Sequence, residues 1–327
     1  MAPSVPSRFE RPTARRVRRV TVIVVGAGIA GLACARELTD AGVPVRVLER
    51  DRTAGGRLAG AHVDGRYADV GAGYLTADDP GFRGRLDGWR ISGLARPWTD
   101  TFDVYTGTER RGTTTGPMRW AAPGGLRSLA EDLARELDVT PEHEVRRVGP
   151  GAVVDGTAAD AVVLAMPGPH ALRVLGGELG RLRAVAGAQR WSPVLAAVLT
   201  YRQRSWRDFH AAFVNAAPVL EKVFDDGDRR GDRAPVLVAH STAGFARQHR
   251  EHPEEAADEL AAAVSELLGV PAGRARVRRW TYAQPEPGEG WFAEQDGVYL
   301  AGDAFGRPRV QTAWRSGRAV ARAIIAR

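Results

Sequence analysis

The chain has 327 residues, of which 44% are hydrophobic and 26% charged, the composition of a globular protein with room for two packed lobes. No run approaches the roughly 18 consecutive apolar residues of a transmembrane helix, so we expect no membrane span. The formal net charge is +7, but the arginines are spread along the chain among acidic residues. We therefore expect attraction of small anionic molecules and no nucleic-acid partner.

The first residues and the cysteine content bear on location. Residues 1–18 are rich in Pro, Ser and Arg, which predicts a disordered basic leader. Its paired arginines resemble an export signal, but the apolar stretch that follows is also the first predicted strand, which cleavage would remove. The single cysteine, Cys34, excludes an internal disulfide and indicates a cytoplasmic location. No group of His, Cys and carboxylates has the spacing of a metal site.

An apolar strand followed by spaced glycines predicts a dinucleotide-binding unit. Residues 21–25 have the apolar, β-branched composition of a buried parallel strand. Gly26, Gly28 and Gly31 follow at G-x-G-x-x-G spacing, which permits a tight turn, close approach to a diphosphate and close packing of helix on strand. A second strand ends at Glu49, about 20 residues after Gly28, where an acid is expected to hold a ribose hydroxyl.

The next motif points to FAD as the dinucleotide. Gly55, Gly56 and Arg57 follow within one short loop; the glycines allow close backbone approach, and the arginine can neutralise phosphate or face a flavin edge. With this element the sequence resembles the flavin-dependent amine oxidase superfamily, in which a G-G-R element follows the first glycine fingerprint. Residues 69–74 are similar to the D-x-G-A-x-Y element that passes near the isoalloxazine in that superfamily.

The carboxy-terminal segments 300–303 and 310–317 extend the resemblance. In the superfamily the aspartate that matches Asp303 binds the ribityl chain, and the next helix directs its N-terminus at the flavin pyrimidine. Such a terminus carries about half a positive charge, which stabilises reduced flavin. The resemblance thus implies non-covalent FAD held from both ends of the chain, by Gly26, Gly28, Ile29, Ala30, Gly31, Glu49, Arg50, Gly56, Arg57, Leu58, Gly71, Ala72, Gly73, Tyr74, Val145, Gly302, Asp303, Val310, Gln311 and Thr312.

The expected fold is α/β, with an FAD-binding Rossmann-like domain of the GR2 type and an inserted α+β substrate domain. The FAD-binding domain is predicted to be discontinuous, over 19–75, 118–172 and 285–327, with the substrate domain over 76–117 and 173–284. Within the insert we predict strands at 194–201 and 236–239 and a helix from Pro253 through Leu268. The charged segment 225–232 is predicted to be an exposed loop.

Within the superfamily the sequence most resembles the short renalase-like branch. The resemblance rests on the modest length, on residues 310–317, and on the stretches 238–242 and 279–282; the chain departs from the branch at Gly73 and Gln311. It implies oxidation of reduced or isomeric nicotinamide dinucleotides by hydride transfer to flavin N5, with O2 reoxidising the flavin to give hydrogen peroxide. No second glycine fingerprint is visible around 150–200, so NAD(P)H would bind as a substrate over the flavin.

The substrate face is predicted from aromatic residues and one histidine. Aromatic rings can enclose a flat ligand, and a histidine can donate to a carboxamide or phosphate. A structural role for the histidine and a core position for the tryptophan are the alternatives. No residue is assigned as acid or base; the substrate-face candidates are Tyr74, His240, Trp280 and Tyr282.

Two other functions remain open at this stage. An amine oxidase or a tailoring-pathway oxidase would share the flavin site. Many amine oxidases of the superfamily use a lysine that holds a water against N5, but the only lysine, Lys222, precedes the acidic segment, a poor place for that role. A non-catalytic protein resembling the guanine-nucleotide dissociation inhibitors is the other alternative; Glu49, Arg57 and Asp303 argue against it.

Overall fold

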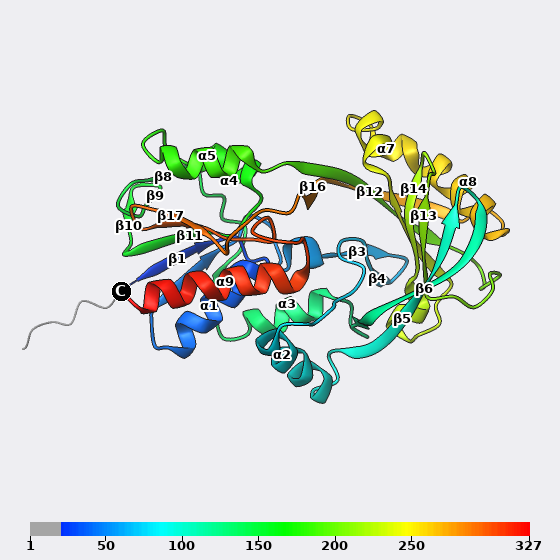
Figure 1. Cartoon of the computed structure of the whole chain (residues 1–327), viewed down its shortest axis with the longest axis horizontal. Helices are drawn as coiled ribbons and strands as arrows, with labels where there is room; N and C mark the ends of the chain where they lie inside the picture. The colour runs from blue at the N-terminus through cyan, green and yellow to red at the C-terminus, as the bar shows by residue number, and fades with distance from the viewer. Residues whose placement is uncertain (1–20) are drawn as a thin grey trace, which may run out of the picture.

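A six-stranded sheet carries the glycine motif in the computed structural model, which describes residues 21–327 (Figure 1). Its order is β17-β18-β11-β1-β2-β7, and all pairs are parallel except the edge pair β17–β18. Its strands are Val22–Val25 (β1), Val45–Leu48 (β2), Asp138–Thr140 (β7), Ala161–Leu164 (β11), Ala293–Gln295 (β17) and Val298–Leu300 (β18). The predicted leader, 1–18, lies outside the described residues.

Helices cover both faces of this sheet because side chains alternate along its central strands. Val22 and Val24 pack in one core with α1 (Ile29–Asp40), α2 (Pro80–Ile91), α3 (Arg127–Ala134) and α9 (Val310–Ile325). Ile23 and Val25 pack in another core with α4 (Gly168–Val174) and α5 (Gly180–Ala188). Burial on both faces explains why β1 is a continuous apolar run.

The first and last helices lie side by side, α1 in blue and α9 in red in Figure 1. Gly317 of α9 faces the backbone of α1 at the crossing. A Cβ atom built on Gly317 would overlap the carbonyl of Ala30, so only glycine allows this approach. The two ends of the described chain therefore pack against each other.

A seven-stranded sheet forms the other half of the molecule, in the order β16-β12-β15-β14-β13-β5-β6. One face is covered by α7 (Ala243–Gln248) and α8 (Ala257–Leu268), with the short helix η2 (Pro253–Ala256) before α8. The predicted strands and helix in this half are confirmed by β12, β15 and α8. The strands are Arg96–Thr106 (β5), Glu109–Ala121 (β6), Trp191–Thr200 (β12), Ala211–Asn215 (β13), Leu220–Asp225 (β14), Val236–Ser241 (β15) and Arg274–Pro285 (β16).

Short elements complete the described residues. The hairpin of β3 (Gly60–Val63) and β4 (Arg66–Asp69) packs on the second face of the large sheet. A small antiparallel sheet contains β8 (Val148–Gly149), β9 (Val153–Val154) and β10 (Thr157–Ala158), and two short helices are η1 (Gly56–Leu58) and α6 (Asp226–Arg230). Within residues 21–327 no helix is long and apolar enough to cross a membrane.

The predicted division into two domains stays a prediction. Two helices assigned to the substrate domain pack elsewhere in the structure. Trp89 of α2 lies in the core beside α1 and α9, and Leu182 of α5 lies in the core on the opposite face of the same sheet.

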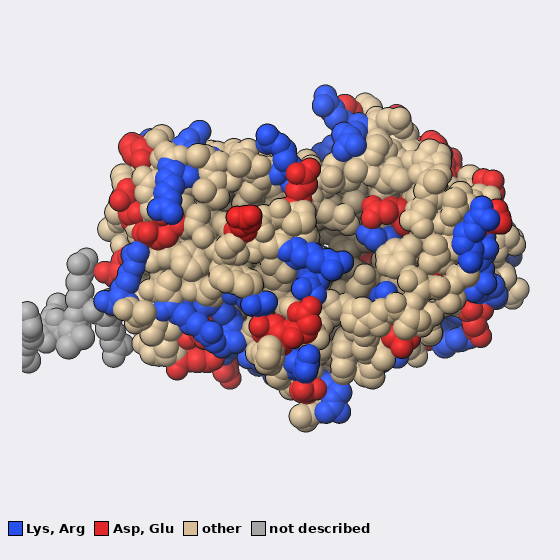
Figure 2. Space-filling model, in the orientation of Figure 1, with Lys and Arg blue, Asp and Glu red and all other residues tan. Residues whose placement is uncertain are grey.

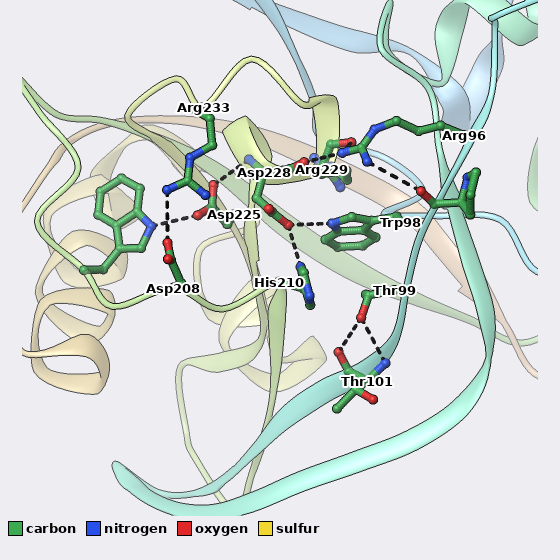
Figure 3. Close-up of polar contacts among 12 residues, drawn as sticks. Arg96, Trp98, Thr99, Thr101, Asp208, His210, Asp225, Asp228, Arg229 and Arg233 are labelled. Atoms are coloured by element: carbon green, nitrogen blue, oxygen red, sulfur yellow. Dashed lines mark hydrogen bonds and ion pairs between the residues drawn. The ribbon is translucent and has the colours of Figure 1, made fainter.

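The prediction of an exposed loop at 225–232 is wrong, because the segment contains α6 and its charges are buried in pairs. Arg229 has no exposed surface and is paired with Asp226, which also accepts a bond from Arg66 at 2.7 Å. Asp228 accepts from the Trp98 indole at 2.7 Å and contacts His210 Nδ1 at 2.6 Å (Figure 3). The density of charged residues in this segment predicted exposure, but ion-pair and hydrogen-bond partners from distant segments offset the cost of burying the charges.

Candidate functional site

A cavity of about 1080 Å³ lies between the two sheets. Its walls come from the ends of β1, β2 and β11, the loop at 70–74, and the strands β6, β12, β14, β15 and β16. Figure 2 shows the surface hollowed between the two halves, with lysine or arginine side chains beside the hollow. The volume exceeds the ~1,000 Å³ upper range of ordinary ligand pockets, so the cavity has room for a dinucleotide and a further molecule.

The glycine motif forms a tight turn at one end of this cavity. Gly26 has a φ of +104°, and a Cβ there would lie 2.6 Å from the carbonyl oxygen of Ala165. Gly28, the N-cap of α1, has nothing within 4 Å of such an atom and lines the cavity. The N-terminus of α1 therefore opens on free space, the arrangement that suits a diphosphate.

Glu49 lies beside this turn, directly after β2. Its Oε2 accepts from the backbone N–H of Ala27 at 2.7 Å, and its Oε1 accepts from the N–H of Asp51 at 2.9 Å. Both bonds hold the carboxylate at the cavity wall, where Glu49 is a lining residue. The position matches that of an acid that binds a ribose hydroxyl.

Arg57 and Asp303 join the amino-terminal and carboxy-terminal motifs. The guanidinium donates to both carboxylate oxygens, with the Nη1–Oδ2 bond at 2.8 Å, and also to the carbonyl of Ala283 at 3.0 Å. Gly71 lies against Arg57, so closely that a Cβ on Gly71 would overlap the carbonyl oxygen of Arg57. Residues from both ends of the chain thus line one cavity.

The opposite wall includes the only lysine of the chain, Lys222. Lys222 on β14 is directly opposite His240 on β15, which places both side chains on the same face of the sheet. Its Nζ is 2.6 Å from Oε1 of Glu221. The expectation that Lys222 is poorly placed for the site is wrong, since the strand carries it to the cavity before the chain reaches the acidic segment.

His240 is buried, 7% exposed, and lines the same wall. Among the described residues its Nε2 has no hydrogen-bond partner. Burial first, and then the charges of Lys222 and Arg229, lower the pKa of His240 to about 3. The imidazole is therefore neutral near pH 7, and its Nε2 is a buried polar atom without a partner among the described residues.

The other substrate-face candidates also line the cavity but differ in their contacts. Trp280 donates its indole N–H to the carbonyl of Val70 at 2.8 Å, so its ring is fixed against the loop at 70–74. Tyr282 lies farther along β16, with its ring 4.9 Å from that of His170 and 6.3 Å from that of Trp191. Tyr74 packs edge-on against Phe102 at 5.4 Å.

Three of the predicted FAD-binding residues do not line the cavity. Gly31 supports the turn, since a Cβ there would overlap the carbonyl of Gly26. The Gln311 side chain accepts from the N–H of Asp78 at 2.8 Å, and Thr312 donates to Arg307 at 2.6 Å. The remaining predicted FAD residues all line the cavity: Gly26, Gly28, Ile29, Ala30, Glu49, Arg50, Gly56, Arg57, Leu58, Gly71, Ala72, Gly73, Tyr74, Val145, Gly302, Asp303 and Val310.

Sequence reasoning missed many further lining residues, among them Arg119, Trp191 and Phe224. Phe224 fills the space beside Gly73, where a Cβ would lie 2.6 Å from its ring. Arg57 stacks over Trp191, 5.1 Å from its ring centroid. Each of these contacts joins segments far apart in sequence, so no local sequence motif predicts it. In residues 21–327 no group of three or more His, Cys, Asp or Glu is arranged to hold a metal ion.

The parallel sheet, the glycine turn and the cavity define a dinucleotide-binding protein with a Rossmann-like fold. Residues 24–86 match the NAD(P)-binding Rossmann-like domain, and residues 101–325 match the flavin containing amine oxidoreductase family. The chain belongs to that flavin containing amine oxidoreductase family. Its fold is α/β, as predicted, and a flavin-containing family agrees with the predicted FAD cofactor; the renalase-like branch stays a prediction.

Individual relatives align over short stretches. A Mycobacterium tuberculosis protein named as a flavin-containing monoamine oxidase is 54% identical over 141 residues, 39% of this chain and 29% of the relative. Putrescine oxidase from Kocuria rosea is 34% identical over 111 residues, 34% of this chain and 22% of the relative. The chain therefore covers less than a third of the length of either relative.

The fold of a solved putrescine oxidase bound to putrescine is similar over nearly the whole chain. The TM-score is 0.71 at 18% identity, with 94% of this chain and 99% of the other covered. At that identity the likeness concerns the fold. The glycine turn, Glu49 and the Arg57–Asp303 pair fit FAD, because the turn leaves an open helix N-terminus and the acid lies at the adjoining strand end.

Proposed function

We propose that this protein is an FAD-dependent oxidase that removes a hydride from the carbon next to the nitrogen of a small amine. Membership of the amine oxidoreductase family supports this reaction class. When bound, FAD supplies the hydride acceptor and passes the electrons to O2, which gives hydrogen peroxide. The protein contributes binding, orientation and control of protons.

For the cofactor, we propose the residues that surround the turn and the ion pair. The N-terminus of α1 would receive the diphosphate beside Gly28, and Glu49 would bind the ribose of the adenosine half. Arg57 and Asp303 would hold the flavin half. In this proposal the mutual pair of Arg57 and Asp303 keeps both side chains oriented toward the cavity.

The observation that carries the proposal is the charge of the wall formed by Lys222, His240 and Arg119. Acidic residues line the cavity only elsewhere among the described residues, at Glu49, Asp51, Glu144 and Asp303, and Asp303 is paired. A protonated amine is disfavoured beside Arg119, which has no ion-pair partner among the described residues, whereas Lys222 is paired with Glu221. The substrate therefore binds as the neutral amine, whose nitrogen lone pair favours loss of hydride from the adjacent carbon.

His240 has a matching role on this wall. Its pKa of about 3 keeps the ring neutral, and its Nε2 lacks a protein partner among the described residues. The neutral ring adds no positive charge beside the bound amine. Trp280 and Tyr74 would then bound the substrate from the sides, because both rings are fixed by contacts of their own.

Anaerobic mixing of the FAD-loaded protein with amines tests the proposal. A panel of primary and secondary amines, with and without carboxylate or phosphate groups, is expected to contain members that bleach the flavin absorbance. Admitting oxygen should then restore the absorbance with release of hydrogen peroxide. If no amine in the panel reduces the flavin, the proposed reaction is refuted.

A reduced nicotinamide dinucleotide, or an isomer of one, is the second candidate substrate. The aromatic rings of Tyr74 and Trp280 and the positive charge of the cavity favour a flat anionic ligand. Hydride loss from a dihydropyridine gives an aromatic cation and needs no base. Bleaching by NAD(P)H or its α-, 2-dihydro or 6-dihydro isomers, in the absence of bleaching by amines, would select this candidate.

A further inference from the structure

We infer that Arg119 is a specificity-determining residue that binds an anionic group of the substrate. The inference rests on the proposed function, since it takes the wall of the cavity near Lys222 to be the substrate side. It narrows the substrate class to molecules that carry a carboxylate or phosphate in addition to the oxidised carbon–nitrogen unit.

The geometry of β6 directs Arg119 into the cavity. Side chains alternate along the strand, so Met118 is 42% exposed at the surface, whereas Arg119 is 6% exposed and lines the cavity. The guanidinium lies over the ring of Phe102, 3.9 Å from its centroid, and 5.5 Å from the centroid of Tyr74. These two rings fix its plane.

The charge of Arg119 has no partner within residues 21–327. Its one protein hydrogen bond runs from Nη1 to the carbonyl oxygen of Asp100 at 2.5 Å, and no carboxylate lies within ion-pair distance. Arg229, equally buried, is paired with Asp226. A buried guanidinium without a counter-ion is costly unless an anion joins it. Arg119 lines the cavity, and its Nε and Nη2 donate to no residue in the described part of the chain.

The planar geometry of the guanidinium determines which chemical group of a ligand it binds best. A guanidinium binds carboxylate and phosphate through two parallel hydrogen bonds, a geometry that an alcohol or an amine does not provide. Lys222 also lines the cavity, but its charge is offset by Glu221 at 2.6 Å. A diamine that is charged at both ends meets repulsion at Arg119, and we therefore place simple dicationic amines outside the substrate range.

Equilibrium binding to the FAD-loaded protein tests this, read from the change in the flavin spectrum without turnover. The probes share one ring and differ in charge: benzoate, phenyl phosphate, benzamide and benzylammonium. We expect benzoate or phenyl phosphate to bind at least about tenfold more tightly than benzamide, and benzylammonium most weakly. The tighter of the two anions identifies carboxylate or phosphate as the preferred group.

Variants locate the effect. Arg119→Gln should weaken the preferred anion at least about tenfold and leave benzamide unchanged. Arg111→Gln is the matched control, because Arg111 lies on the same strand, is exposed, and does not line the cavity. If Arg119→Gln does not retain FAD, Arg119→Lys provides the test, because it keeps the positive charge but loses the two parallel N–H donors of the guanidinium. This variant too should bind the anion more weakly.

Three results would each overturn the inference. These are equal binding of anionic and neutral probes to the wild-type protein, equal effects of the Arg119 and Arg111 variants, and unchanged anion affinity in Arg119→Lys. Because the assay measures binding alone, an anion preference that depends on Arg119 would stand even if no amine reduced the flavin. Failure of the inference and failure of the proposed reaction are thus separate outcomes.

Discussion

The close crossing of α1 and α9 allows us to predict how much stability is lost when Gly317 is replaced by alanine. A Cβ there would lie 2.8 Å from the carbonyl carbon of Ala30 and 3.1 Å from its Cα, so Gly317→Ala forces the two helices apart. Overpacking of this kind costs about 1–3 kcal/mol. Backbone atoms cannot rotate away, which favours the upper half of that range, and the helix propensity of alanine offsets ~0.5–1 kcal/mol. The net loss of stability is about 1–2.5 kcal/mol.

The assay is thermal unfolding of Gly317→Ala beside Gly84→Ala. Gly84 also lies in a helix, α2, but a Cβ there meets nothing within 4 Å. At roughly 2 °C per kcal/mol for a large domain, the melting temperature should fall by about 2–5 °C in Gly317→Ala and rise by about 1–2 °C in Gly84→Ala. Equal melting temperatures for the two variants would refute close packing of the first and last helices.

Two further predictions concern the wall opposite the glycine turn. Lys222→Met should retain FAD but slow reduction of the flavin by the best amine at least about tenfold, measured by stopped-flow absorbance. A wild-type rate of flavin reduction would exclude a role for Lys222 in the reaction. The pKa of His240 falls from 6.5 to about 3 on folding, so between these pH values the unfolded chain binds one more proton than the folded chain. The buried neutral His240 therefore lowers the stability of the protein progressively as pH falls from about 6.5 toward 3. In that window His240→Gln should lose stability less steeply than the wild type, by up to about 1.4 kcal/mol per pH unit, in denaturant titrations at several pH values. Parallel curves for the two proteins would contradict the assigned burial.

The features that sequence predicted well depend on neighbours in the chain. The turn at Gly26 needs a positive φ that favours glycine, and Glu49 follows at a spacing set by one helix and one strand. Asp303 lies three residues after the end of a buried strand of the same sheet. In each case a local structural or chemical requirement restricts a few neighbouring residues, and the resulting short sequence motif can be recognised.

The features that sequence missed depend on pairing between distant strands. Lys222 reaches the cavity because β14 pairs with β15 in one register, and a shift by one residue would point it to the opposite face. Arg119 enters the site through β6, whose sequence carries no ligand motif. Two carboxylates of α6, Asp226 and Asp228, also bind partners more than 100 residues away, Arg66 and Trp98.

The central claim is that both ends of the chain hold one FAD, and titration of the FAD-free protein with FAD tests it most directly. Two single variants accompany the wild type: Gly28→Val, where a side chain has open space and would occupy the cavity, and Asp303→Asn, which weakens the pair with Arg57. We predict one FAD per wild-type chain and at least about tenfold weaker binding in each variant. Unchanged affinity in either variant, or no FAD uptake by the wild type, would contradict the claim.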